Sequence, residues 1–229
     1  MLFYALQRIN ARQAFVQRIQ SDGGDIGALR LRHEFIEAVM TILIIGLAIF
    51  LGMHSISIAT PGLRARAVAS MGPNRWRGVY SLVSASGFVL ILLGFHTARQ
   101  APVVLYMPPA WMRHVTLLLM LPVFPLIFAA YLPGRIKTAV KHPMLAAVKL
   151  WAFAHLLSNG MLAEVLLFGA FLVWAICDRI SLKHRPSQAI HTAPQGRFND
   201  LIAVVAGLAL YVFFILWAHM RLIGVSPLG

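Results

Sequence analysis

Charged side chains are scarce in this chain. They make up 12% of its 229 residues, whereas hydrophobic residues make up 59%, and an average soluble domain is about 25% charged. Acidic residues are the rarest, with 7 Asp and Glu against 20 Lys and Arg. This composition excludes an ordinary soluble domain and predicts an integral membrane protein.

Cysteine is nearly absent as well. Cys177 is the single cysteine, so an internal disulfide is excluded, and there is no CxxC or CxxCH motif for a metal or for covalent haem attachment. The sequence also lacks GxGxxG, P-loop, HExxH and GxSxG motifs and a pair of buried carboxylates. These absences exclude the usual machinery of hydrolysis and nucleotide chemistry, and they leave the catalytic residues unknown.

Six apolar runs approach the roughly 20 residues that span a hydrocarbon core. They cover residues 40–58, 79–95, 115–132, 143–157, 161–177 and 201–222. We therefore expect an all-α, polytopic transmembrane helix bundle of about six spans. The fourth run is only about 22 Å long at 1.5 Å per residue, and a shallow or re-entrant fourth helix would leave five spans.

Turn and proline signals divide these runs further. Ser158, Asn159 and Gly160 form a tight turn, which predicts an antiparallel hairpin of the fourth and fifth helices. Pro122 and Pro125 predict a kink or a local break in the third helix. The segment 101–114, "APVVLYMPPAWMRH", is too interrupted to span a membrane, and we expect it to cap the bundle at the non-cytoplasmic interface.

Basic residues orient the bundle through the positive-inside rule. Eleven of them lie in loops that should share one face: Arg64, Arg66, Arg75, Arg77, Arg135, Lys137, Lys141, Arg179, Lys183, Arg185 and Arg197. We assign this face to the cytoplasm. The net charge of +13 does not indicate a nucleic-acid partner, because these residues lie between apolar runs rather than in one patch or tail.

Residues 1–39 are more polar than the rest of the chain, and they carry no apolar signal core or cleavage site. Met40 begins the first apolar run directly. Our hypothesis is that Met40 is the native start and that 1–39 is an upstream extension of a membrane domain covering 40–229. The alternative is a genuine helix at the membrane interface.

Histidines in the apolar runs are the best candidates for a cofactor site. His54 in the first run and His142 at the start of the fourth fall at similar depth, so two helices could clamp a b-type haem between these imidazoles. His155 lies thirteen residues after His142, about 20 Å further along the helix, and so belongs to the other end. Lys149 either snorkels to the headgroups or pairs with a haem propionate. The plain alternative is that His142 is an interfacial cap and His155 only donates a hydrogen bond.

Three stretches resemble a known family. They are "LGMHSISI" in the first span, "RWRGVYSLVSASGFVLI" entering the second, and "HPMLAAVKLWAFAHLLSNGMLAEVLLFGAFLVWAICDR" across the fourth and fifth. Together they are similar to the NnrU family of bacterial membrane proteins, which is related to the plastid 15-cis-zeta-carotene isomerase. The resemblance covers the chain from about residue 40 to its end.

The resemblance implies a multi-pass protein of the bacterial inner (cytoplasmic) membrane that is linked to denitrification. A respiratory nitrogen-oxide reductase, for nitric oxide or nitrite, is the implied partner besides the lipid bilayer. The isomerase relative is a haem b enzyme that acts on a cis double bond of a polyene. Its ligand motifs match here at His54 and His142, and His155 matches a further histidine and is the reserve ligand.

Three functions follow from the sequence and the resemblance. The first is a haem-binding membrane protein that handles nitric oxide or assists a reductase. The second is a haem-dependent cis-trans isomerase of a carotenoid-like polyene that enters from the bilayer. The third is a structural membrane subunit without a cofactor. Whether the protein is an enzyme is left open by the sequence.

Overall fold

Helices provide all the regular structure in the part of the chain that the computed structural model describes, residues 26–185 and 192–229. Beside them these residues form one isolated bridge, between Val104 and Met161. The all-α prediction is therefore confirmed for them. The helices are α2 (Ile26–Ala59), α3 (Pro61–Met71), α4 (Pro73–Ala98), α5 (Met112–Met120), α6 (Val123–Tyr131), α7 (Arg135–Val140), α8 (Pro143–Ser158), α9 (Leu162–Ser181), α10 (Asn199–Phe213), the π-helical turn η1 (Phe214–Ala218) and α11 (His219–Ile223).

Among the described residues, four helical segments are long and apolar enough to cross a membrane, so the expected count of about six spans is not confirmed. They are Leu29–Ile56, Pro73–Ala98, Met112–Tyr131 and Asn199–Ile223. Helix α8 is apolar but has only 16 residues. Every 18-residue stretch of α9 contains the charged residues Glu164, Asp178 and Arg179. The length and composition of the four segments indicate a membrane protein.

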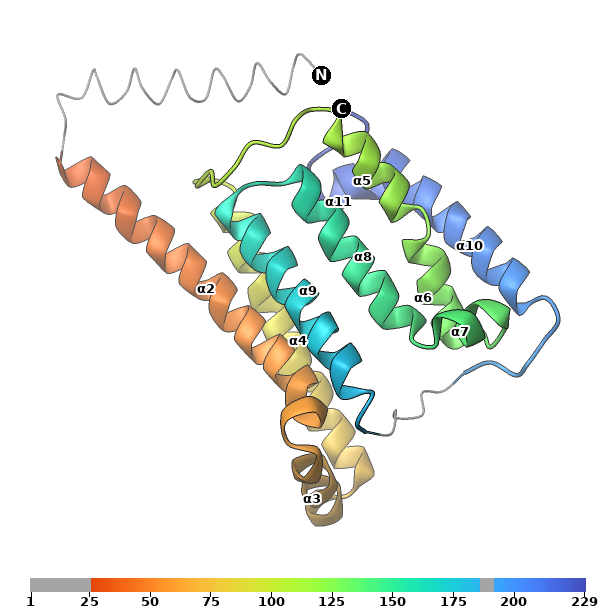
Figure 1. The fold of residues 1–229 in the computed structure, drawn as a ribbon. Helices are drawn as coiled ribbons and strands as arrows, with labels where there is room; N and C mark the ends of the chain where they lie inside the picture. The colour runs from red at the N-terminus through yellow and green to blue at the C-terminus, as the bar shows by residue number, and fades with distance from the viewer. Residues whose placement is uncertain (1–25, 186–191) are drawn as a thin grey trace.

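The bundle has α8 and α9 near its middle (Figure 1). Helices α2 and α4 lie together against α9, whereas α5, α6 and α10 lie on the far side of α8. The main core contains buried residues of α2, α4, α8 and α9, among them Leu43, Ile91, Ala152 and Phe168. Helices α8 and α9 form the antiparallel hairpin that the Ser158–Gly160 turn predicts.

The third apolar run is broken at its prolines, as predicted. Helix α5 ends at Met120 and α6 begins at Val123, because Pro122 and Pro125 lack the amide hydrogens that a continuous helix needs. Pro125 is buried in close contact with α10, where a Cβ added to Gly207 would lie 2.4 Å from its nitrogen. The break thus lets α6 approach α10 closely.

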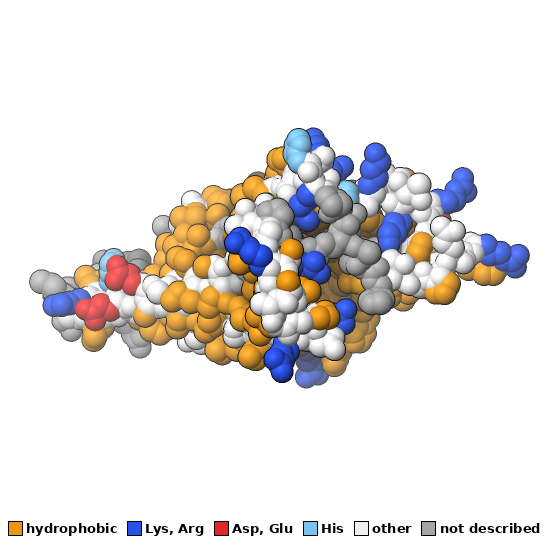
Figure 2. Space-filling view, turned by 90° about the horizontal axis from the view of Figure 1, so that it is seen from below, with side chains coloured by type: hydrophobic (Ala, Val, Ile, Leu, Met, Phe, Trp, Pro, Cys, Tyr) orange, Lys and Arg blue, Asp and Glu red, His pale blue; other side chains and the backbone are white. Residues whose placement is uncertain are grey.

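The elements that carry the eleven basic residues of the sequence pattern lie at one end of the bundle, which we call the basic end. They are α3, α7, the starts of α4, α8 and α10 and the end of α9, with the residues next to them. Figure 2 views the molecule from this end and shows Lys and Arg side chains spread across the face. This distribution agrees with the single positively charged face that the sequence predicts and from which the orientation in the membrane was inferred.

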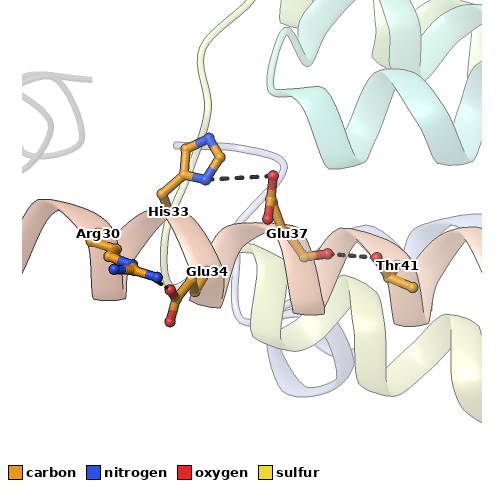
Figure 3. Close-up of polar contacts among 5 residues, drawn as sticks. All are labelled: Arg30, His33, Glu34, Glu37 and Thr41. Carbon is orange, nitrogen blue, oxygen red and sulfur yellow. Dashed lines mark hydrogen bonds and ion pairs between the residues drawn. The ribbon is translucent and has the colours of Figure 1, made fainter.

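Helix α2 extends beyond the other helices at the end opposite the basic end (Figure 1). Its polar part is held by pairs one turn apart: Arg30 Nε lies 3.0 Å from Glu34 Oε1, and His33 Nδ1 lies 3.4 Å from Glu37 Oε1 (Figure 3). Such pairs support a helix without an apolar face. The helix passes through Met40 without a break; the proposed start at Met40 stays a prediction.

The loop between α4 and α5 packs on the turn between α8 and α9. The amides of Leu105 and Tyr106 donate to the Gly160 carbonyl at 2.9 and 3.2 Å, and the Tyr106 hydroxyl donates to the carbonyls of Leu156 and Asn159. Burial, and secondarily the negative charge of Glu164, raises the pKa of Tyr106, which keeps its hydroxyl a donor. The loop therefore covers this end of the hairpin.

Candidate cofactor site

His54 lies near the basic end of α2 among aromatic rings from three helices. Its ring stacks on Phe50 of the preceding turn with centroids 4.3 Å apart. It lies 5.4 Å from the ring of Tyr80 on α4 and 6.0 Å from that of Trp174 on α9. We call these four residues the His54 cluster.

A hydrogen bond fixes the tautomer of His54. Its Nδ1 lies 2.7 Å from the carbonyl oxygen of Phe50, and a carbonyl can only accept, so Nδ1 carries the proton of the neutral ring. The lone pair is then on Nε2, the atom that a metal ion requires. Since such a bond also orients a ligating imidazole and raises its basicity, His54 fits the chemistry of an axial haem ligand.

His155 has the same local arrangement at the other end of α8. Its Nδ1 donates to the carbonyl of Trp151 at 2.8 Å, and its ring stacks on Phe168 at 4.6 Å. The hydrogen bond stays within α8 and does not cross the hairpin. His155 therefore also presents an unprotonated Nε2 in its neutral form, which suits the reserve role that the family motif predicts.

An aromatic stripe on α9 connects the two histidines. Phe168, Phe171 and Trp174 follow one another at three-residue spacing, so they share one side of the helix. Phe168 contacts His155, Trp174 contacts His54, and Phe171 lies between, 5.5 Å from Trp151 and 5.7 Å from Phe50. Sequence reasoning missed this stripe, although the spacing in "FGAFLVW" was a visible signal for it.

His142 is presented by a strained turn. Lys141 has φ 63° and ψ −46°, and the amide of His142 donates to the Val140 carbonyl at 2.8 Å, which is a γ-turn of the rare positive-φ type. Pro143 follows and begins α8. Burial, and secondarily the positive charge of Arg179, lowers the pKa of His142, so its ring is neutral at pH 7, as a ligand must be.

Replacing Lys141 by glycine is expected to stabilise the fold, because glycine adopts positive φ without the strain that costs other residues about 1–3 kcal/mol. A thermal melt of the purified protein would show a higher Tm. The control is Lys137→Gly within α7, where the helix loses propensity and the bond from Lys137 Nζ to the Ala130 carbonyl at 2.7 Å; its Tm should fall. A Tm for Lys141→Gly at or below wild type would show that this turn is unstrained.

Lys149 lies seven residues after His142, two turns along α8 and on the same side of the helix. Its positive charge is close enough to contribute to the lowered pKa of His142. Lys149 is half-buried, and its alternative roles, snorkelling or pairing with an anion, stay predictions.

Helix α9 lies between α2 and α8 (Figure 1). His54 and His142 are therefore both near the basic end, as their positions in the sequence predict, on α2 and at the start of α8, two of the helices that α9 contacts. The structure brings His54 together with Trp174, and His142 with the end of α9 at Asp178 and Arg179. Among the described residues no three His, Cys, Asp or Glu side chains form a group that would hold a metal ion. His54 thus fits the chemistry of a ligand, and its pairing with His142 on one haem stays a prediction.

An apolar groove of about 650 Å³ lies beside the His54 cluster, between α2 and α9. Gly52 and Gly169 line it, and an added Cβ at either would meet nothing within 4 Å. Trp174 lines the groove and contacts His54 as well, and its Nε1 is buried without a hydrogen-bond partner among the described residues. The groove is of ordinary ligand-pocket size.

Apolar helices with one basic end and a histidine that presents an unprotonated nitrogen among aromatic rings define a polytopic helical membrane protein with a candidate ligand for a metal cofactor. The chain belongs to the NnrU family: the family described as NnrU protein matches residues 42–227. The resemblance seen in the sequence is thus confirmed, and the match includes His54, His142, Lys149 and His155. No curated protein and no solved structure matches the chain.

Proposed function

We propose that this NnrU-family chain is a membrane protein that binds haem b, with Nε2 of His54 as an axial ligand. The observation that carries the proposal is the hydrogen bond from His54 Nδ1 to the Phe50 carbonyl, which leaves Nε2 unprotonated. Phe50, Tyr80 and Trp174 hold the ring from three helices. These aromatic side chains keep water away, which favours a largely apolar macrocycle.

The His54 cluster contains one histidine, which supports a role in nitric oxide chemistry. Haem b, if held by His54, would supply an iron centre that can take up a small diatomic molecule. We therefore propose a link to denitrification in a bacterial inner membrane, with a respiratory nitrogen-oxide reductase as partner.

Titration of the reduced, purified protein with nitric oxide tests this function. We expect the Soret band of wild type and of His142→Ala to shift equally, because the proposal makes His54 the one histidine ligand. A clamp by both histidines predicts the opposite pattern, with a shift only after His142 is replaced. A wild-type spectrum that nitric oxide leaves unchanged would contradict the proposed role.

The apolar groove favours a second candidate function, the isomerisation of a polyene. Its lining is almost entirely apolar, it lies between α2 and α9, and it shares Trp174 with the His54 cluster. A lipophilic substrate entering from the bilayer would meet it directly. Incubation of the reconstituted protein with a cis-polyene, followed by chromatography of the isomers, separates the two candidates: conversion that is lost with His54→Ala supports the isomerase.

A further inference from the structure

A second hollow, of about 810 Å³, opens at the basic end. The residues that line it belong to other segments of the sequence than the His54 cluster. It lies between the segment that joins α6 to α7 and the segment before α10. Its lining contains three cations, Arg135, Lys137 and Arg197, together with the neutral polar side chains of Thr138 and Gln195. None of the described residues that line it is acidic.

Buried polar contacts fix the two walls of this hollow. Asn199, which is 7% exposed, donates from Nδ2 to the carbonyls of Pro133 at 2.8 Å and Pro194 at 3.0 Å. Each wall is thus tied to the same side chain. A buried side chain that is not one of the lining cations therefore holds the two walls together.

The carboxylate of Asp200, at the start of α10, is held by backbone amides of the segment that lines the hollow. Its two oxygens accept from the amides of Arg135 and Ile136 at 2.8 and 3.0 Å. Lys137 Nζ donates to the Ala130 carbonyl at 2.7 Å, and the guanidinium of Arg197 lies 4.4 Å from the ring centre of Phe198. These contacts position Lys137 and Arg197 at the lining of the hollow. No acidic side chain among the described lining residues balances the charges of the three cations.

We propose that this hollow binds the phosphate headgroup of an anionic phospholipid in the leaflet at the basic end. Two candidate membrane spans, Met112–Tyr131 and Asn199–Ile223, end and begin at its rim, so it lies at the level of the headgroups. Basic pockets at this level bind acidic lipids. Arg135 and Arg197 bind the phosphate oxygens, while the amide of Gln195 supplies a neutral donor for the rest of the headgroup.

Thermal melts of the delipidated full chain in neutral detergent test the proposal with phosphatidylglycerol, phosphatidylcholine or inorganic phosphate. Phosphatidylglycerol should raise the Tm by at least about 4 °C at saturating concentration, and the other two should not. An equal shift with phosphatidylcholine overturns the proposal. So does a full shift with inorganic phosphate, which would make the site one for the free ion.

The variant Arg135→Gln with Arg197→Gln should lose the shift. The matched control, Arg64→Gln with Arg66→Gln, removes as much charge from the same end on α3 and should keep it. If both double variants lost the Tm shift equally, the lipid would be attracted to the whole basic end by its charge and not bound at this site. Gln195→Glu adds a negative charge to the lining with little change in side-chain size, and it should also abolish the Tm shift with phosphatidylglycerol. This variant tests the proposal even if the double arginine variant does not fold.

Discussion

Replacing Gly94 by alanine is expected to separate α2 from α4 and to destabilise the protein by at least about 1–3 kcal/mol. A Cβ at this position would lie 2.6 Å from the Leu43 nitrogen and 2.7 Å from its Cα. Both are backbone atoms, so α2 itself has to move, and Leu43 is fully buried in the core. Alanine improves helix propensity by only about 1 kcal/mol, which does not offset the clash.

Two further glycines make the same contact along this helix pair. An added Cβ at Gly46 would lie 2.6 Å from the Ile91 nitrogen, and one at Gly87 would lie 2.7 Å from the Phe50 nitrogen. Small residues at membrane-helix interfaces permit such close approach. Because Phe50 accepts the hydrogen bond from His54, Gly87→Ala should disturb the His54 cluster as well as the fold.

The control for Gly94→Ala is Gly52→Ala, which changes the same residue type on α2 where nothing lies within 4 Å. Its Tm should equal or exceed that of wild type, whereas Gly94→Ala should melt several degrees lower and give less monodisperse protein in size-exclusion chromatography. If both variants melt alike, the two helices do not approach as closely as the structure shows.

Replacing His54 by alanine is expected to remove most of the haem while the helices persist. The substitution deletes the only imidazole of the His54 cluster, the side chain that the proposal assigns to the iron. The structural cost is small, because the Phe50 carbonyl is part of the helix that continues to Ala59. The absorption spectrum of the oxidised and reduced protein measures the loss, and far-UV circular dichroism checks the helix content.

The matched control is His114→Ala, which removes an exposed histidine from α5 at the other end of the bundle. Its Soret band should match that of wild type. Rescue provides the second test: His54→Gly should regain a Soret band when free imidazole is added, since imidazole occupies the space of the lost ligand. A His54→Ala protein with an unchanged spectrum would show that His54 is not a ligand.

The sequence predicts the apolar helices closely where an apolar run and a turn signal coincide. The fourth run was expected to be helical over 143–157 and forms a helix over Pro143–Ser158. The first helix was expected to begin at Met40, but its described part already begins at Ile26, because charged pairs such as Arg30 with Glu34 support a helix that has no apolar pattern. Helices α3 and α7 were missed for the related reason that both are short and polar.

The candidate site was predictable only in part. His54 and His142 stand out in the sequence because titratable side chains in apolar runs are costly and tend to be retained for function. Helix periodicity fixes their depth, but it does not fix which helix lies between two others. That lateral order depends on side-chain packing along whole helices, such as the contact of Phe171 with both Phe50 and Trp151. The position of α9 between α2 and α8 was therefore not visible in the sequence.

Haem content of the wild-type protein is the most direct test of the central claim. The protein is produced in haem-replete cells, purified in mild detergent, and assayed by its Soret band and by conversion of the bound haem to its pyridine complex. The His54 ligand predicts about one non-covalent haem b per chain. A folded, monodisperse protein without a Soret band would contradict haem binding and would favour a structural membrane subunit without a cofactor.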